Sequence, residues 1–188
     1  FSNYLRHRDD FSEVINYYQN IRKMGYSSLK LENKNKEGEE LVFQHINISL
    51  SKEDTLNFIQ KSHNSYNTQA NDLLITALLL AIGLYKGTYD LLLELEGHGR
   101  EGELDLSRTL GWFTSMYPAY LKLSDPTDLS RCIKEIKEQL RAIPEKGIGY
   151  GICISQNKLS PIKGDLIFNY LGQWDTGKEA HKYFNFDY

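Results

Sequence analysis

The segment "TYDLLLELEGHGRE" (88–101) carries the strongest pattern in the chain. Its leucines alternate with a second set of residues that ends in two carboxylates, Glu94 and Glu96. This period of two predicts a strand over 88–97. Gly97 and Gly99 then permit a sharp turn or the close approach of a substrate. The pattern leaves two interpretations open: neighbouring carboxylates suited to proton transfer, or the solvated end of a strand.

The rest of the chain alternates helical and extended patterns around this segment, which predicts an α/β fold with a mixed sheet and flanking helices. Further strands are expected over 40–50, 115–123 and 165–172. Helices are expected over 9–24, 51–66, 73–83 or 73–87, and 129–143. Ser51, Asn71 or Asp72, and Thr127 or Asp128 are the expected helix caps. Polar residues 32–40 and the glycine-punctuated "GIGYG" (147–151) are expected to be loops.

The composition is that of a single soluble globular domain, with 188 residues, 40% apolar and 25% charged. A net charge of −3 gives no reason to expect nucleic acid or an anionic membrane as a partner. Cys132 and Cys153 are too few and too far apart for a disulfide framework or a zinc site, which favours the cytoplasm. The histidines have no metal-ligand spacing, so no metal site is expected. The apolar run 73–85 is too short to span a bilayer.

Of three other motifs, two carry candidate site residues. In "LSRTLGWFTSMYP" (106–118), Arg108 can stack on an aromatic ring or pair with a carboxylate, unless the loop only packs its aromatics into the core. "GIGYG" lacks the spacing of a nucleotide-binding loop. "FNYLG" (168–172) places Asn169 and Tyr170 on opposite faces of the predicted strand, so that one of them can point into a site.

The order of these motifs resembles that of the epimerization domains of nonribosomal peptide synthetases, from about residue 41 to residue 175. "EGHGRE" followed by "RTLGWFTSMYP" separates this group from ordinary condensation domains. The five segments that carry the resemblance are "SYNTQANDLLITALLLA", "LELEGHGRE", "SRTLGWFTSMYP", "GIGYG" and "FNYLGQWD".

The resemblance implies one lobe of a two-lobed fold like that of chloramphenicol acetyltransferase. Residues 1–30 would be the helical segment joining the lobes, and residues 31–188 the C-terminal lobe. The family's H-H-x-x-x-D-G motif belongs to the N-terminal lobe, and no adjacent histidines occur here. We therefore expect a piece of a longer synthetase that lacks the N-terminal lobe and is inactive by itself.

The implied activity is that of an isomerase in antibiotic or other secondary-metabolite biosynthesis. A peptidyl carrier domain presents an aminoacyl or peptidyl thioester on its 4′-phosphopantetheine arm, and the chain itself binds no cofactor. Removal and return of the Cα proton give a mixture of L and D forms. By position in the motifs, Glu96 corresponds to the catalytic glutamate. Arg108, Asn169 and Tyr170 would line or order the site, whereas His98 and Arg100 would shape the turn.

Three alternatives stay open. A condensation domain would join two carrier-bound groups through an amide bond, although "LEGHGRE" argues against it. A non-catalytic module would only dock a carrier domain. A free-standing acyltransferase of the same fold would still require the missing histidines.

Overall fold

The computed structural model of the protein describes residues 10–26, 28–29, 44–61, 66–100, 105–106 and 108–172. Its centre is a three-stranded sheet in the order β2-β1-β3, formed by β1 (Asp90–Gly97), β2 (Ser115–Lys122) and β3 (Leu166–Phe168). β1 runs antiparallel to β2 and parallel to β3. The predicted α/β class with a mixed sheet is therefore confirmed.

β1 changes character along its length. Its first four residues are buried, including Leu91, Leu92 and Leu93, so both faces of the strand are covered there. From Glu94 onward only Leu95 is buried, because the alternate positions are carboxylates and a glycine. The predicted alternation is thus real, and it leaves one face of the strand partly open at its carboxyl end.

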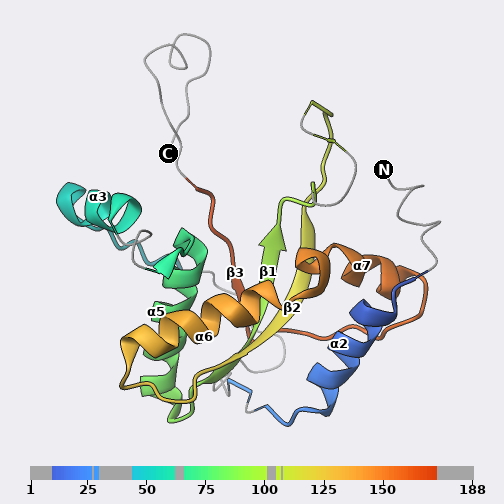
Figure 1. Ribbon diagram of the computed structural model, residues 1–188, viewed down its shortest axis with the longest axis horizontal. Coiled ribbons are helices and arrows are strands. Elements are labelled where there is room, and N and C mark those ends of the chain that lie inside the picture. The colour runs from blue at the N-terminus through green and yellow to red at the C-terminus, as the bar shows by residue number, and fades with distance from the viewer. Residues whose placement is uncertain are drawn as a thin grey trace.

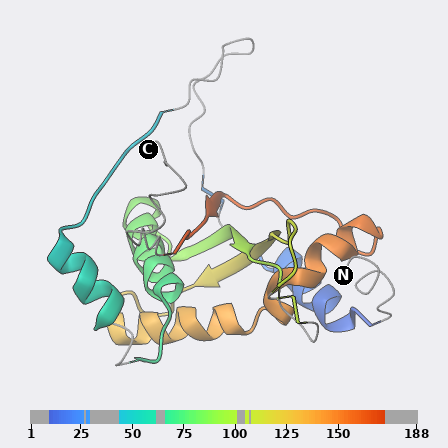
Figure 2. The same cartoon turned by 90° about the horizontal axis from the view of Figure 1, so that it is seen from above.

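The helices form two groups around the sheet (Figures 1 and 2). In both views α6 (Leu129–Arg141) lies across one face of the sheet and packs beside α5 (Ala70–Lys86). At the other end α2 (Ser12–Lys23) packs beside α7 (Ile148–Ser155). Among the described residues, no helix is long and apolar enough to cross a membrane.

Local capping signals account for the starts of α3, α5 and α6. Ser51 accepts a hydrogen bond from the Asp54 amide at the start of α3 (Lys52–Gln60), and Asp128 caps α6 in the same way, as predicted. The expected cap of α5, Asn71 or Asp72, was wrong, because Gln69 is the N-cap residue and its backbone N–H donates to the Asp72 carboxylate at 2.8 Å. Asp72 therefore supplies the returning half of a capping box.

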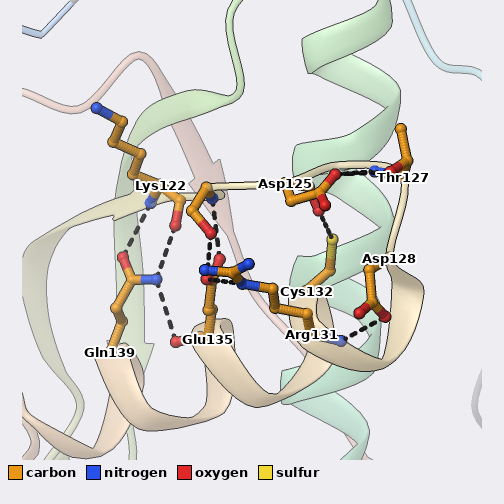
Figure 3. Close-up of polar contacts among 9 residues, drawn as sticks. Lys122, Asp125, Thr127, Asp128, Arg131, Cys132, Glu135 and Gln139 are labelled. Atoms are coloured by element: carbon orange, nitrogen blue, oxygen red, sulfur yellow. Dashed lines mark hydrogen bonds and ion pairs between the residues drawn. The ribbon is translucent and has the colours of Figure 1, made fainter.

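Side chains of α6 bond to the last residue of β2 and to the turn that follows it (Figure 3). The Gln139 amide accepts from the Lys122 backbone N–H at 2.9 Å and donates to its carbonyl at 2.8 Å, as a neighbouring strand would. The Glu135 carboxylate accepts from the Ser124 amide and hydroxyl and from Arg131. The bonds from Ser124 hold the pKa of Glu135 below its usual value. The two bonds from Gln139 thus satisfy the backbone N–H and carbonyl of Lys122, the last residue of β2, which would otherwise be open to another strand.

Two predicted strands differ from the structure. Residues 44–50 form no strand, and Ile46 and Ile48 are 85% and 88% exposed, because alternation makes a strand only when a partner pairs with it. The C-terminal strand ends at Phe168, so Asn169 and Tyr170 follow β3 rather than lie within it. Residues 32–40 and 62–65 lie outside the described residues, and α3 ends at Gln60, short of the predicted 66.

The predicted loop at 147–151 was also wrong. Gly147 ends a short 3-10 turn (Pro144–Gly147), and α7 begins at the next residue. Gly149 serves helix packing, since a Cβ at this position would lie 3.0 Å from a Val14 methyl group of α2. A glycine inside a helix lowers helix propensity, but here it allows two helices to approach closely.

Candidate functional site

Glu96 lies near the carboxyl end of β1, where the strand's open face begins. It pairs with Met116 across the antiparallel ladder and is half-buried. The parallel register pairs Leu95 of β1 with Phe168 of β3. Asn169, the residue after Phe168, therefore lies beside Glu96, the residue after Leu95. The Asn169 side-chain amide donates a hydrogen bond to the Glu96 carboxylate at 2.6 Å.

The hydrogen bond between Asn169 and Glu96 joins residues from two motifs that lie far apart in the sequence. It holds Oε2 of Glu96, and no other hydrogen bond connects this carboxylate to a described residue. A neutral amide donor orients a carboxylate without neutralising its charge. The arrangement can therefore accept and return a proton at a fixed place on the sheet.

Glu94, the other carboxylate of this face, has a different task. Its Oε1 accepts from the Gly164 backbone N–H at 2.8 Å, at the turn that leads into β3. A Cβ at residue 164 would lie 2.7 Å from the Glu94 backbone nitrogen, so only glycine fits there. The sequence pattern does not distinguish Glu94 from Glu96. In the structure Glu94 accepts a hydrogen bond from the turn before β3, whereas Glu96 accepts one from Asn169.

His98 and Arg100 belong to the loop between β1 and β2, which rises above the sheet in Figure 1. The His98 Nδ1 accepts from the Arg100 amide at 3.1 Å. The Arg100 guanidinium donates to the carbonyls of Leu106 and Thr109, and lies 4.2 Å from the centre of the Phe113 ring. Arg100 thus connects the two ends of this loop through charge-assisted and cation–π contacts.

Arg108 and Tyr170 are exposed, and neither has a hydrogen bond or ion pair with another described residue. The structure therefore unites Glu96 with Asn169 but does not bring Arg108 or Tyr170 into that contact. Met116 and Gly164 also border this site, and neither was expected from the sequence. Residues 88–97 and 115–123 were both predicted strands, and pairing them as a hairpin would have placed Met116 opposite Glu96. No local pattern indicated Gly164.

Thiol and metal chemistry have little support in the described residues. Cys132 and Cys153 are fully buried, and burial raises the pKa of both thiols, which makes them poor nucleophiles. No group of three or more histidine, cysteine, aspartate or glutamate side chains in the described part of the chain is placed to hold a metal ion.

Comparison with known proteins identifies the family of this chain. The family model for the condensation domain matches residues 3–187. The chain belongs to the condensation-domain family. Its fold resembles that in the crystal structure of the epimerization domain from the third module of tyrocidine synthetase B, with a TM-score of 0.73 and 32% identity. That match covers 94% of this chain and 42% of the other, so this condensation-family chain corresponds to less than half of that domain.

Curated relatives of this condensation-family chain are peptide synthetases. It is 47% identical over 137 residues to bacitracin synthase 2 of Bacillus licheniformis, and the match covers 69% of this chain and 5% of the relative. It is 41% identical over 141 residues to tyrocidine synthase 2 of Brevibacillus parabrevis, and that match covers 70% of this chain and 4% of the relative. The chain thus spans a small fraction of these relatives' length.

Proposed function

We propose that this chain is the C-terminal lobe of an epimerization domain in a nonribosomal peptide synthetase, with residues 1–30 joining it to the preceding lobe. The observation that carries the proposal is the 2.6 Å hydrogen bond between Asn169 and Glu96, which links "EGHGRE" and "FNYLG" at one point of the sheet. The likeness to a solved epimerization domain over 94% of the chain supports it.

In the proposed reaction Glu96 exchanges a proton with the α-carbon of an aminoacyl or peptidyl thioester. When the Cα–H bond breaks, its electron pair moves into the thioester carbonyl and forms an enolate, while a base takes the proton. Return of a proton to the opposite face inverts the centre. Asn169 keeps the Glu96 carboxylate aimed at the α-carbon, which raises the fraction of time in productive geometry. A histidine of the preceding lobe would serve the other face.

The substrate would arrive on the 4′-phosphopantetheine arm of a carrier domain, with no resident cofactor on this lobe. Carrier and other synthetase domains are accordingly the proposed partners. Arg108 and Tyr170, exposed near the same end of the sheet, remain proposed lining residues. They would act on the thioester or its carrier rather than on Glu96.

A second candidate is amide-bond formation, which is favoured by the description of the matching family model, the condensation domain. The two functions differ in their product. Epimerization leaves the tethered acyl group the same length, whereas condensation transfers it to a second carrier-bound amine. Mass analysis of the carrier-bound product distinguishes them directly.

The decisive experiment is deuterium uptake at Cα of a carrier-tethered aminoacyl thioester in heavy water, with this lobe joined to its preceding lobe. We expect exchange in the native protein and its loss in Glu96→Gln. The matched control is Glu94→Gln, which alters a carboxylate on the same face but retains an oxygen to accept from Gly164. Equal loss in both variants, or exchange that survives Glu96→Gln, would contradict the assignment.

A further inference from the structure

Met116 is the cross-strand partner of Glu96 on the side away from Asn169. The strand order β2-β1-β3 places Met116 on one flank of Glu96 and Asn169 on the other. Cross-strand partners share a face, with their Cβ atoms about 4.5–5.5 Å apart. The Glu96 carboxylate is therefore bordered by a thioether on one side and an amide on the other.

The side chain of Met116 is not part of the core, because it is 44% exposed. A second exposed apolar residue, Ile167, pairs with Glu94 one step down the same face and is 65% exposed. Both alternate with residues that pack inward: Tyr117 is 9% exposed next to Met116. Core packing thus explains their neighbours but not these two side chains.

The chemistry at Glu96 determines what meets Met116. A base must come within about 3–3.5 Å of the carbon that loses its proton. That carbon bears three other groups, of which the amine or amide and the thioester carbonyl are polar and the side chain is variable. The polar groups suit the Asn169 flank, so the amino-acid side chain lies toward the apolar flank.

We propose that Met116 contacts the side chain attached to the reacting α-carbon and sets the size of side chain that is accepted. This inference rests on the proposed epimerase function. An unbranched, polarisable thioether adapts to different shapes, so it forms a permissive wall rather than a fitted pocket. In a hydrophobic pocket one methylene changes the specificity ratio by about 10- to 200-fold, so we expect an open wall to act at the lower end of that range.

The test compares Cα deuterium uptake from carrier-tethered phenylalanyl and alanyl thioesters, with the two-lobed protein and subsaturating substrate. Met116→Ala opens space on this flank and should raise the phenylalanyl-to-alanyl ratio about tenfold or more. Met116→Gln keeps the length but makes the wall polar, so the ratio should fall. Because the side chain is exposed, the Gln variant is expected to fold even if the Ala variant does not.

The matched control is Met24→Ala. Met24 is similarly exposed, at 50%, but lies at the end of α2. Its variant should keep the native ratio. Native exchange with an unchanged ratio in the Met116 variants overturns this inference alone. Absence of exchange in the native protein with both thioesters overturns the proposed function, and this inference with it.

Discussion

Gly99→Ala, in the loop beside the candidate site, should lower the unfolding free energy more than the same substitution at Gly87 or Gly151. Gly99 has a φ of +65°, which is unfavourable for residues with a Cβ atom. A Cβ at this position would also lie 1.5 Å from the Phe113 carbonyl oxygen and 2.6 Å from its carbon. These are backbone atoms, so no rotamer change relieves the overlap.

Two other glycines separate the two contributions. Gly87 has a φ of +79° but no atom within 4 Å of its Cβ position, so Gly87→Ala should cost only the conformational part, about 1–2 kcal/mol. Gly99→Ala adds an overpacking cost of about 1–3 kcal/mol. Gly151, inside α7 with open space at its Cβ position, should gain about 0.5–1 kcal/mol as alanine.

The assay is guanidinium unfolding followed by circular dichroism, which gives the unfolding free energy of each variant. The expected order of stability is Gly151→Ala above native, then Gly87→Ala, then Gly99→Ala. If Gly99→Ala is only as destabilised as Gly87→Ala, the overlap with Phe113 is relieved at no cost. In that case the loop is not held in the way that the Arg100 contacts imply.

Two further predictions concern the fold. Gln139→Ala removes both side-chain bonds to Lys122 and should lower the unfolding free energy by about 1–2 kcal/mol in urea, whereas Gln139→Glu keeps the acceptor and should lose less; equal losses would mean that the bond accepted from the Lys122 N–H contributes nothing. Burial raises the pKa of Tyr17 from 10.0 to about 12 and that of Tyr18 further. Above pH 10 the unfolded chain releases protons that the folded protein keeps, so stability should fall by about 1.4 kcal/mol per pH unit for each of these tyrosines up to about pH 12. Urea unfolding at pH 9, 10 and 11 checks this, and a stability independent of pH would contradict it.

The features that sequence alone predicted are those set by neighbouring residues. The alternation of 88–97 predicted β1 because Leu91, Leu93 and Leu95 all enter the core, although Asp90 and Leu92 on the other face are buried as well. Ser51 and Asp128 cap their helices through bonds to amides three residues away. The carboxyl end of β1 was therefore predictable as the place where a buried strand becomes open.

The features that sequence alone did not predict depend on segments far apart in the chain. Residues 44–50 alternate as a strand does, yet no described strand pairs with them. The glycines of 147–151 indicate a loop until the contact of Gly149 with Val14 is known. The distinction between Glu94 and Glu96 required the register of β3, and local pattern gives no information about a parallel partner 70 residues away.

Because Gly164 lies close against β1, the number of residues that follow it decides which side chain lies beside Glu96. Gly164 and the pairing of Leu166 with Leu93 fix where β3 starts, and counting forward from there brings Asn169 beside Glu96. One inserted residue would place Phe168 at that position, and one deleted residue would place Tyr170 there. Either change would exchange an amide donor for an aromatic ring. The number of residues between Gly164 and Asn169 therefore controls which side chain meets Glu96, separately from how well β3 packs.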